Sequence, residues 1–174
     1  MRVLFYMLSI IAANIITAKI APLNLGLFIV PTGTLLIGLT FILRDLVQMR
    51  HGRKQTYKII SFALIASALT SYLLGDTLWI VFASTIAFIV SETTDTEIFT
   101  RLKTSLTKRV MWSGVIGGTL DSAIFAVIGL SPLGANFLTW SEIWLAIIGQ
   151  VIVKIVMQMF GSTILKYLSK GGEH

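Results

Sequence analysis

The sequence has 174 residues, of which 55% are hydrophobic and only 13% charged, and its mean hydropathy is +0.86. This is more apolar surface than a soluble domain of that length can bury, so the composition predicts an integral membrane protein. The net charge of +6 lies in short Lys and Arg clusters between apolar stretches, which is typical of membrane topology and not of a nucleic-acid partner. Without cysteine, disulfides and thiolate chemistry are excluded.

Six apolar stretches of bilayer-spanning length follow one another along the chain. They are Val3–Ala21, Leu25–Leu43, Ile59–Gly75, Leu78–Ile98, Val110–Leu130 and Ile143–Leu165. The sequence therefore predicts an all-α polytopic membrane protein with six transmembrane helices, forming one domain over residues 1–174.

Basic residues occur in every second connection and at both ends. They are Arg2; Arg44, Arg50, Arg53, Lys54 and Lys58; Arg101, Lys103, Lys108 and Arg109; and Lys166 and Lys170. The connections between these clusters hold no Lys or Arg, so the positive-inside rule predicts that both termini are cytoplasmic in a multi-pass protein of the inner membrane.

Two segments depart from a plain hydrophobic helix. From Thr96 to Lys108, apolar residues recur at helical spacing among basic ones, which predicts an amphipathic continuation of the fourth helix along the cytoplasmic interface. The segment from Pro31 to Thr34 would either break the second helix near the midplane or only kink it.

Ionisable residues lie inside the apolar stretches, where a charge costs at least ~2.5 kcal/mol and therefore indicates a functional site. They are Lys19, Glu92, Asp95, Asp121 and Lys154. Lys19 lies near the outer surface and is interpreted as structural. At about 1.5 Å per residue, side chains of four predicted helices reach ~13 to ~18 Å into a layer of about 30 Å. These are Asn14, Glu92, Asp121 and Lys154.

Helical spacing places some of these groups on common faces. Gln150, Lys154 and Gln158 recur every four residues, and Ser113, Gly117 and Asp121 do the same on the preceding helix. We interpret the pattern as a polar cavity near the midplane that binds a small organic molecule. The structural interpretation is a buried ion pair that only joins helices. Apolar contacts would join the helices without the desolvation cost of burying charges.

Several other function classes find no support in the residues. No phosphate-binding loop, metal-ligand spacing or set of nucleophile, base and orienting group occurs, so we predict neither an enzyme nor a cofactor or metal. A membrane enzyme using Glu92 or Asp95 as acid or base, and a structural or signalling bundle without cargo, remain as rival hypotheses.

Five pieces of the sequence resemble the YhhQ-like queuosine precursor transporters, also called the VUT or vitamin uptake family. They are Asn14; Arg44 to Gln48 followed by Gly52; Glu92-x-x-Asp95-x-x-Ile98-Phe99; Ser113-x-x-x-Gly117-x-x-x-Asp121-Ser122; and Lys154. The chain departs from the family pattern at Met49 and at Gly118, where an amide residue usually precedes the aspartate by three.

The resemblance implies a secondary transporter that imports a 7-deazaguanine base such as 7-cyano-7-deazaguanine. Asp121 or Glu92 would accept from the base edge, Lys154 would face the ring oxygen or pair with a carboxylate, and Asn14 and Gln150 would fill the remaining polar positions. Asp95 belongs to the same candidate site. A wall such as Phe125 would stack on the ring.

Some properties of the transporter stay open at this point. Proton coupling through Asp121 and Lys154 and simple facilitated diffusion are both compatible with the residues, as are a monomer and a homodimer. The alternative function is the substrate-binding S-component of an energy-coupling-factor vitamin transporter, which would need an ATPase module as partner. The other partners expected are the deazapurine and the lipid bilayer.

Overall fold

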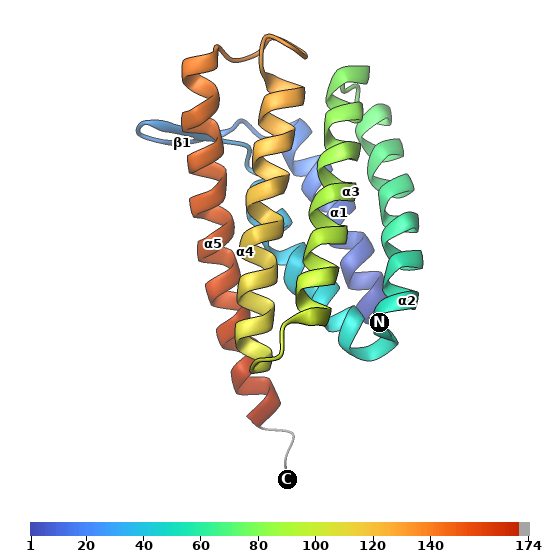
Figure 1. Cartoon of the computed structure of the whole chain (residues 1–174). Helices are drawn as coiled ribbons and strands as arrows, with labels where there is room; N and C mark the ends of the chain where they lie inside the picture. Colours follow the sequence, from blue (N-terminus) through green and yellow to red (C-terminus); the bar gives the residue numbers. More distant parts are fainter. Residues whose placement is uncertain (171–174) are drawn as a thin grey trace.

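The computed structural model describes residues 1–170, without the side chains of Ile29 and of residues 164–170. Its elements are α1 (Arg2–Lys19), β1 (Leu23–Leu25), β2 (Phe28–Val30), α2 (Thr34–Leu73), α3 (Leu78–Arg101), α4 (Leu106–Ile124), the π-helical turn η1 (Phe125–Leu130) and α5 (Trp140–Lys170). Figure 1 shows the helices side by side in one bundle. Within the described residues, five helices are long and apolar enough to cross a membrane. The chain is therefore a predominantly helical, multi-pass membrane protein with one short β-hairpin.

The long helix α2 consists of two segments that meet at Gly52. Forty residues in one straight helix would extend about 60 Å, twice the hydrocarbon thickness. Gly52 has φ 75° and ψ 167°, a backbone conformation that glycine adopts without a side-chain clash. The chain consequently reverses there, beside the N-terminus, and residues 34–51 and 53–73 run in opposite directions (Figure 1).

The predicted span Leu25–Leu43 is wrong in its first part. Strands β1 and β2 form an antiparallel hairpin in which Leu25 pairs with Phe28, and Gly26 occupies the turn with φ 76°. Leu25 to Val30 are apolar enough for a membrane helix, but the glycine turn and Pro31 stop a helix from forming until Thr34. The helix then continues past Leu43 to the break at Gly52.

The predicted amphipathic helix from Thr96 to Lys108 is also not formed. Helix α3 ends at Arg101, four residues are non-helical, and α4 begins at Leu106. The backbone of Leu102 is extended, and Arg109 donates from Nε to the Phe99 carbonyl oxygen at 2.9 Å. This contact across the turn brings the start of α4 back against the end of α3.

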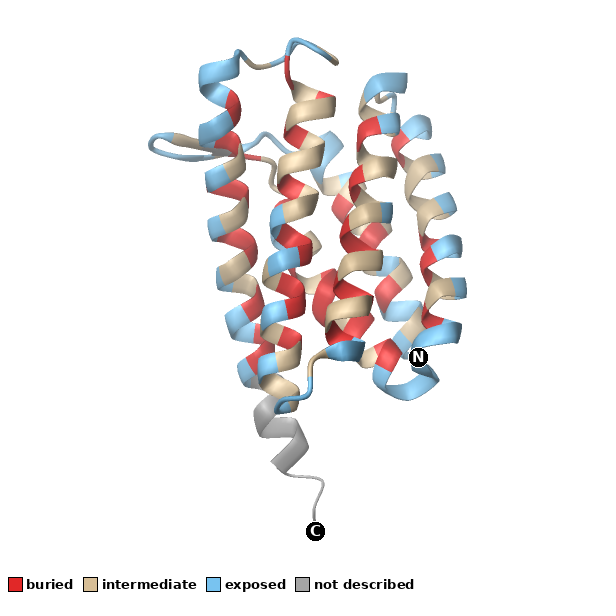
Figure 2. Cartoon of the chain, viewed as in Figure 1, coloured by how far each residue is buried: buried red, intermediate tan, exposed pale blue. Residues whose placement is uncertain are grey.

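Burial follows the inward faces of the helices (Figure 2), and many of the exposed residues have large hydrophobic side chains. Tyr6, Ile10, Val47 and Ala63 form a buried cluster between α1 and both segments of α2. Large side chains on the outside are exposed, as the lipid-facing surface of a bundle requires. Examples are Phe62, Leu69, Phe82, Trp144, Met159 and Phe160.

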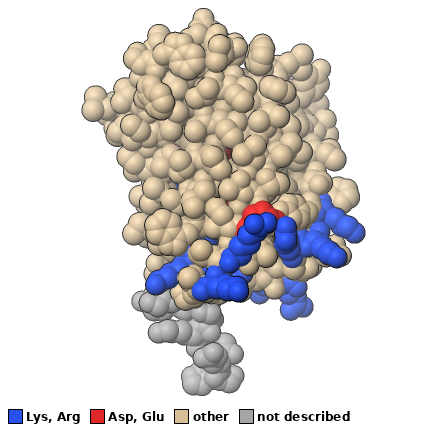
Figure 3. All heavy atoms as spheres, viewed as in Figure 1, with Lys and Arg blue, Asp and Glu red and all other residues tan. Residues whose placement is uncertain are grey.

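Exposed basic residues gather at one end of the bundle, which we call the basic end (Figure 3). It carries Arg50, Arg53, Lys54, Lys58, Arg101, Lys103 and Lys108. Arg44, which the sequence analysis assigned to the same loop cluster, is instead fully buried, because α2 extends two turns beyond it. Lys166 and Lys170 belong to the same prediction, but their side chains are not in the part of the chain that the structure describes.

Close approach of α1 to the start of α2 depends on Gly33. A Cβ at this position would overlap the Ala13 carbonyl oxygen and the Thr17 hydroxyl. We expect Gly33→Ala to lower stability by about 1–3 kcal/mol, because a backbone atom cannot move aside as a side chain can. Thermal melting of the detergent-purified variant measures this, with exposed Ala18→Ser on α1 as the control. Equal melting temperatures for Gly33→Ala and wild type would contradict it.

Candidate functional site

A cavity of about 120 Å³ lies in the interior of the bundle, bounded by side chains of all five helices and of η1. Its polar wall includes Asn14, Thr17, Thr34, Ser67, Ser71, Asp76, Ser84, Glu92, Asp121 and Gln150. Phe41, Phe88 and Phe125 add aromatic surface. Such a mixture of apolar walls and a few convergent polar groups is typical of a small-molecule site.

Four of the six candidate residues from the sequence line this one cavity. They are Asn14, Glu92, Asp121 and Gln150, from α1, α3, α4 and α5. Lys154 does not line the cavity but lies behind Asp121, and Asp95 is buried one turn from Glu92 towards the basic end. Phe125, the proposed stacking residue, lies at the first position of η1 and faces the cavity.

Lys154 and Asp121 form a buried ion pair between α5 and α4. Lys154 Nζ lies 2.6 Å from Asp121 Oδ2, and it also donates to Ser122 Oγ at 2.7 Å and to the Gly118 carbonyl oxygen at 3.3 Å. Lys154 is 3% exposed and Asp121 16%, because the carboxylate reaches the cavity and the ammonium does not. The lysine therefore fixes the position of the carboxylate.

Glycines on α4 make room for these groups. A Cβ at Gly118 would lie 3.3 Å from Lys154 Cδ, and a Cβ at Gly117 would lie 2.9 Å from the Cβ of Asp95. The missing side chain at Gly118 thus leaves space for the stem of Lys154. Small residues permit this close packing of α4 against α3 and α5.

The two amide side chains in the cavity wall differ in which hydrogen-bonding atoms remain available to a ligand. Asn14 Nδ2 donates to the Ser67 carbonyl oxygen at 3.0 Å and lies 3.1 Å from Ser67 Oγ, so its own carbonyl oxygen remains. Gln150 Nε2 is buried and has no hydrogen-bond partner among the described residues. Glu92 Oε2 likewise accepts no hydrogen bond, although it lies 3.4 Å from Arg44 Nε. The wall of the cavity consequently contains an unused donor as well as carboxylate acceptors.

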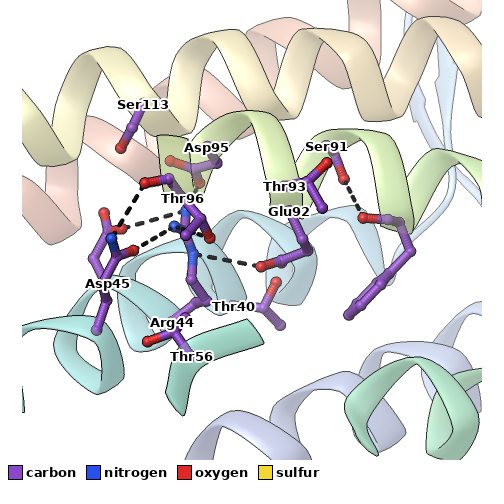
Figure 4. A network of polar contacts seen from close by, with 12 residues as sticks. Thr40, Arg44, Asp45, Thr56, Ser91, Glu92, Thr93, Asp95, Thr96 and Ser113 are labelled. Carbon is purple, nitrogen blue, oxygen red and sulfur yellow. Dashed lines mark hydrogen bonds and ion pairs between the residues drawn. The ribbon is translucent and has the colours of Figure 1, made fainter. Parts of the chain in front are cut away.

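A second group of polar residues surrounds Arg44 (Figure 4). This fully buried guanidinium forms ion pairs with Asp45 at 3.3 Å, with Glu92 at 3.4 Å and with Asp95. Its Nη1 also donates to Thr96 Oγ1 and to Gln48 Oε1, both at 3.1 Å. We call Arg44, Gln48, Asp45, Glu92, Asp95 and Thr96 the Arg44 network.

A buried role for Arg44 was not predicted, because this residue directly follows an apolar stretch and precedes a basic cluster. The available signal was Gly52, which ends the helical segment two turns later. Asp95, one of the predicted site residues, belongs to this network and not to the cavity wall. Glu92 belongs to both.

Residues 70–169, more than half of the chain, match the protein family described as "Putative vitamin uptake transporter". No curated protein and no solved structure matches the chain. The matched region contains Glu92, Asp121, Gln150 and Lys154, whereas Asn14 and Arg44 precede it.

Proposed function

Because this chain belongs to the vitamin uptake transporter family, and is thus a multi-pass membrane transporter, we propose that it imports a queuosine precursor. The cargo is a 7-deazaguanine base such as 7-cyano-7-deazaguanine. The protein acts as a secondary transporter of the inner membrane, and the cavity between Asn14, Glu92, Asp121 and Gln150 receives the base.

The proposal includes six membrane spans with both termini in the cytoplasm. Each of the two segments of α2 on either side of Gly52 is long enough to span the hydrocarbon layer, as are the four other helices. The basic end then faces the cytoplasm under the positive-inside rule (Figure 3). The α2–α3 turn at Asp76 lies at the opposite end of the bundle, and the hairpin projects sideways in the half of the bundle nearer that end (Figure 1).

The observation that carries the proposal is that an unpaired donor and carboxylate acceptors line the same cavity. A guanine-like edge presents an N–H and an amino group side by side, which the carboxylate of Asp121 or Glu92 accepts. The ring oxygen accepts from Gln150 Nε2, and leaving that buried donor unpaired costs about 1–3 kcal/mol. Phe41, Phe88 and Phe125 supply apolar surface for the rings.

Thermal stabilisation of the purified protein tests the cargo class. We expect 7-deazaguanines to raise the melting temperature, since a ligand at 100 times its Kd stabilises the folded state by about 2.7 kcal/mol. Gln150→Leu is expected to reduce this shift, whereas Glu142→Gln, at an exposed carboxylate near the same end of α5, leaves it unchanged. Stabilisation by a vitamin and by no deazapurine would refute the proposed cargo.

Uptake measurements on the purified protein distinguish a secondary transporter from the S-component of an energy-coupling-factor transporter. In proteoliposomes that contain only this chain, a secondary transporter takes up the base without ATP. An S-component instead remains inactive until an ATPase module is added, and it copurifies with that module. Uptake that strictly requires ATP and the module would replace the proposal.

A further inference from the structure

Two hollows lie on opposite sides of the Arg44 network. The first is the cargo cavity. The second is an open hollow of about 400 Å³ at the basic end, between the Gly52 reversal, the end of α3 and the start of α4. Gln48, Arg53, Phe99, Thr100, Leu106 and Arg109 contribute to its wall.

The order of residues along two helices places the network between the hollows. On α2, Phe41 lines the cavity, Arg44 follows about one turn later, and Gln48 lines the second hollow one turn beyond. On α3, Glu92 lines the cavity and Thr100, about two turns later, lines the second hollow. The network residues of both helices fill the turns in between, as Figure 4 shows for Arg44 and its partners.

Hydrogen bonds across this layer join α2 to α3. Gln48 Nε2 donates to the Thr96 carbonyl oxygen at 3.2 Å and to Thr100 Oγ1 at 2.8 Å, and Arg44 Nη1 donates to Thr96 Oγ1 at 3.1 Å. Arg44, Gln48 and Thr96 are all buried. A molecule in the cargo cavity therefore cannot reach the second hollow while these contacts persist.

The hydrogen-bond donors that the second hollow offers to a ligand belong to arginine. Arg109 lies 4.2 Å from the centre of the Phe99 ring and uses Nε for the Phe99 carbonyl oxygen, which leaves its terminal N–H groups. Arg53, which pairs with Glu97, lies in the same wall, whereas the Thr100 hydroxyl already donates to the Thr96 carbonyl oxygen at 2.7 Å. A flat heteroaromatic molecule with a carbonyl oxygen fits such a surface, because its oxygen can accept from the terminal N–H groups of Arg109 and its ring can stack on a planar guanidinium group.

We propose that the Arg44 network is the gate of the transport path and that the second hollow is an exit site for the same flat, carbonyl-bearing cargo. This inference rests on the proposed function. Opening separates residues 44–48 of α2 from residues 92–100 of α3, and the donors of the exit hollow then bind the acceptor atoms of the cargo. Arg44 and Gln48 act as positioning residues that control passage and not the first binding step.

Cross-linking across the gate tests the inference, and the natural chain offers no competing cysteine. In Gln48→Cys/Thr100→Cys, a short reducible dithiol-reactive linker is expected to lower uptake of the deazaguanine at least tenfold relative to the same variant before linking, and reduction returns uptake to that level. Binding in the cavity, measured by thermal stabilisation, persists in the linked protein. Thr139→Cys/Glu142→Cys, whose native side chains are also in contact at 2.7 Å but remote from both hollows, retains uptake.

Unchanged uptake in the linked gate variant would overturn the gate, whereas loss of both uptake and cavity binding would show damage to the fold and overturn it as well.

A second measurement needs no cargo. In oriented vesicles, an impermeant thiol reagent is expected to label Ser84→Cys from the outer side only and Thr100→Cys from the cytoplasmic side only. Labelling of either cysteine from both sides contradicts a closed layer between the hollows. Absence of uptake in the unmodified protein, with this labelling intact, refutes the proposed cargo and not the closed layer.

Discussion

Asp121→Asn is expected to lower the initial rate of precursor uptake by roughly 30-fold or more, because loss of one member of a buried, hydrogen-bonded charge pair costs about 2 kcal/mol or more. The asparagine keeps the shape of the side chain but removes the charge that faces both Lys154 and the cavity. Lys154 Nζ, at 2.6 Å, would then be a buried cation without a counter-charge. The loss is measured as a lower queuosine content of tRNA in cells that cannot make the precursor themselves.

A double variant separates a binding role from a structural one. Asp121→Asn/Lys154→Met removes both charges, so if the pair only joins α4 to α5, uptake returns together with stability. If Asp121 accepts from the base edge, stability returns and uptake does not. Glu142→Gln, the same change at an exposed position, serves as control. Wild-type uptake by Asp121→Asn at equal abundance would remove this residue from the binding site.

Arg44→Met is expected to destabilise the folded bundle by about 3–5 kcal/mol, the usual cost of leaving buried charges without their partner. Asp45, Glu92 and Asp95 all lie around this guanidinium, and neither oxygen of Asp45 accepts a hydrogen bond from the described residues. Without Arg44, these carboxylates must take up protons or draw in water. The melting temperature is therefore expected to fall by on the order of 10 °C.

Two comparisons make this result specific to the buried site. Arg50→Met, at an exposed position on the same helix, is expected to melt as wild type does, since isolated surface charges contribute little. Arg44→Lys retains the charge but lacks the planar set of donors that reaches Thr96, Gln48 and the carboxylates, so it should melt between the two. Equal stability of Arg44→Met and wild type would show that the network does not hold α2 to α3.

The helical fold could largely be predicted because lipid imposes a simple rule on sequence. Backbone groups in hydrocarbon must bond within their own helix, so long apolar stretches such as Leu78–Ile98 and Val110–Leu130 become helices with little influence from their neighbours. Hydropathy failed at Leu25 to Val30, because an apolar hairpin with Gly26 in its turn and Pro31 after its second strand has the same composition as half a helix. Local turn residues, not mean hydropathy, decide such a segment.

What the sequence alone determined was that charged side chains lie within membrane-spanning helices, because the cost of a charge in hydrocarbon depends on depth and depth can be counted along a helix. Only the tertiary structure decided how these charges are divided. Asp121 pairs with Lys154 at the cavity, while Glu92 and Asp95 pair with Arg44, which the sequence placed in a loop. This division depends on which helix faces come into contact. The contacts between helix faces depend in turn on the reversal at Gly52 and on the space left by Gly117 and Gly118. The spacing of residues within a single helix does not predict such contacts.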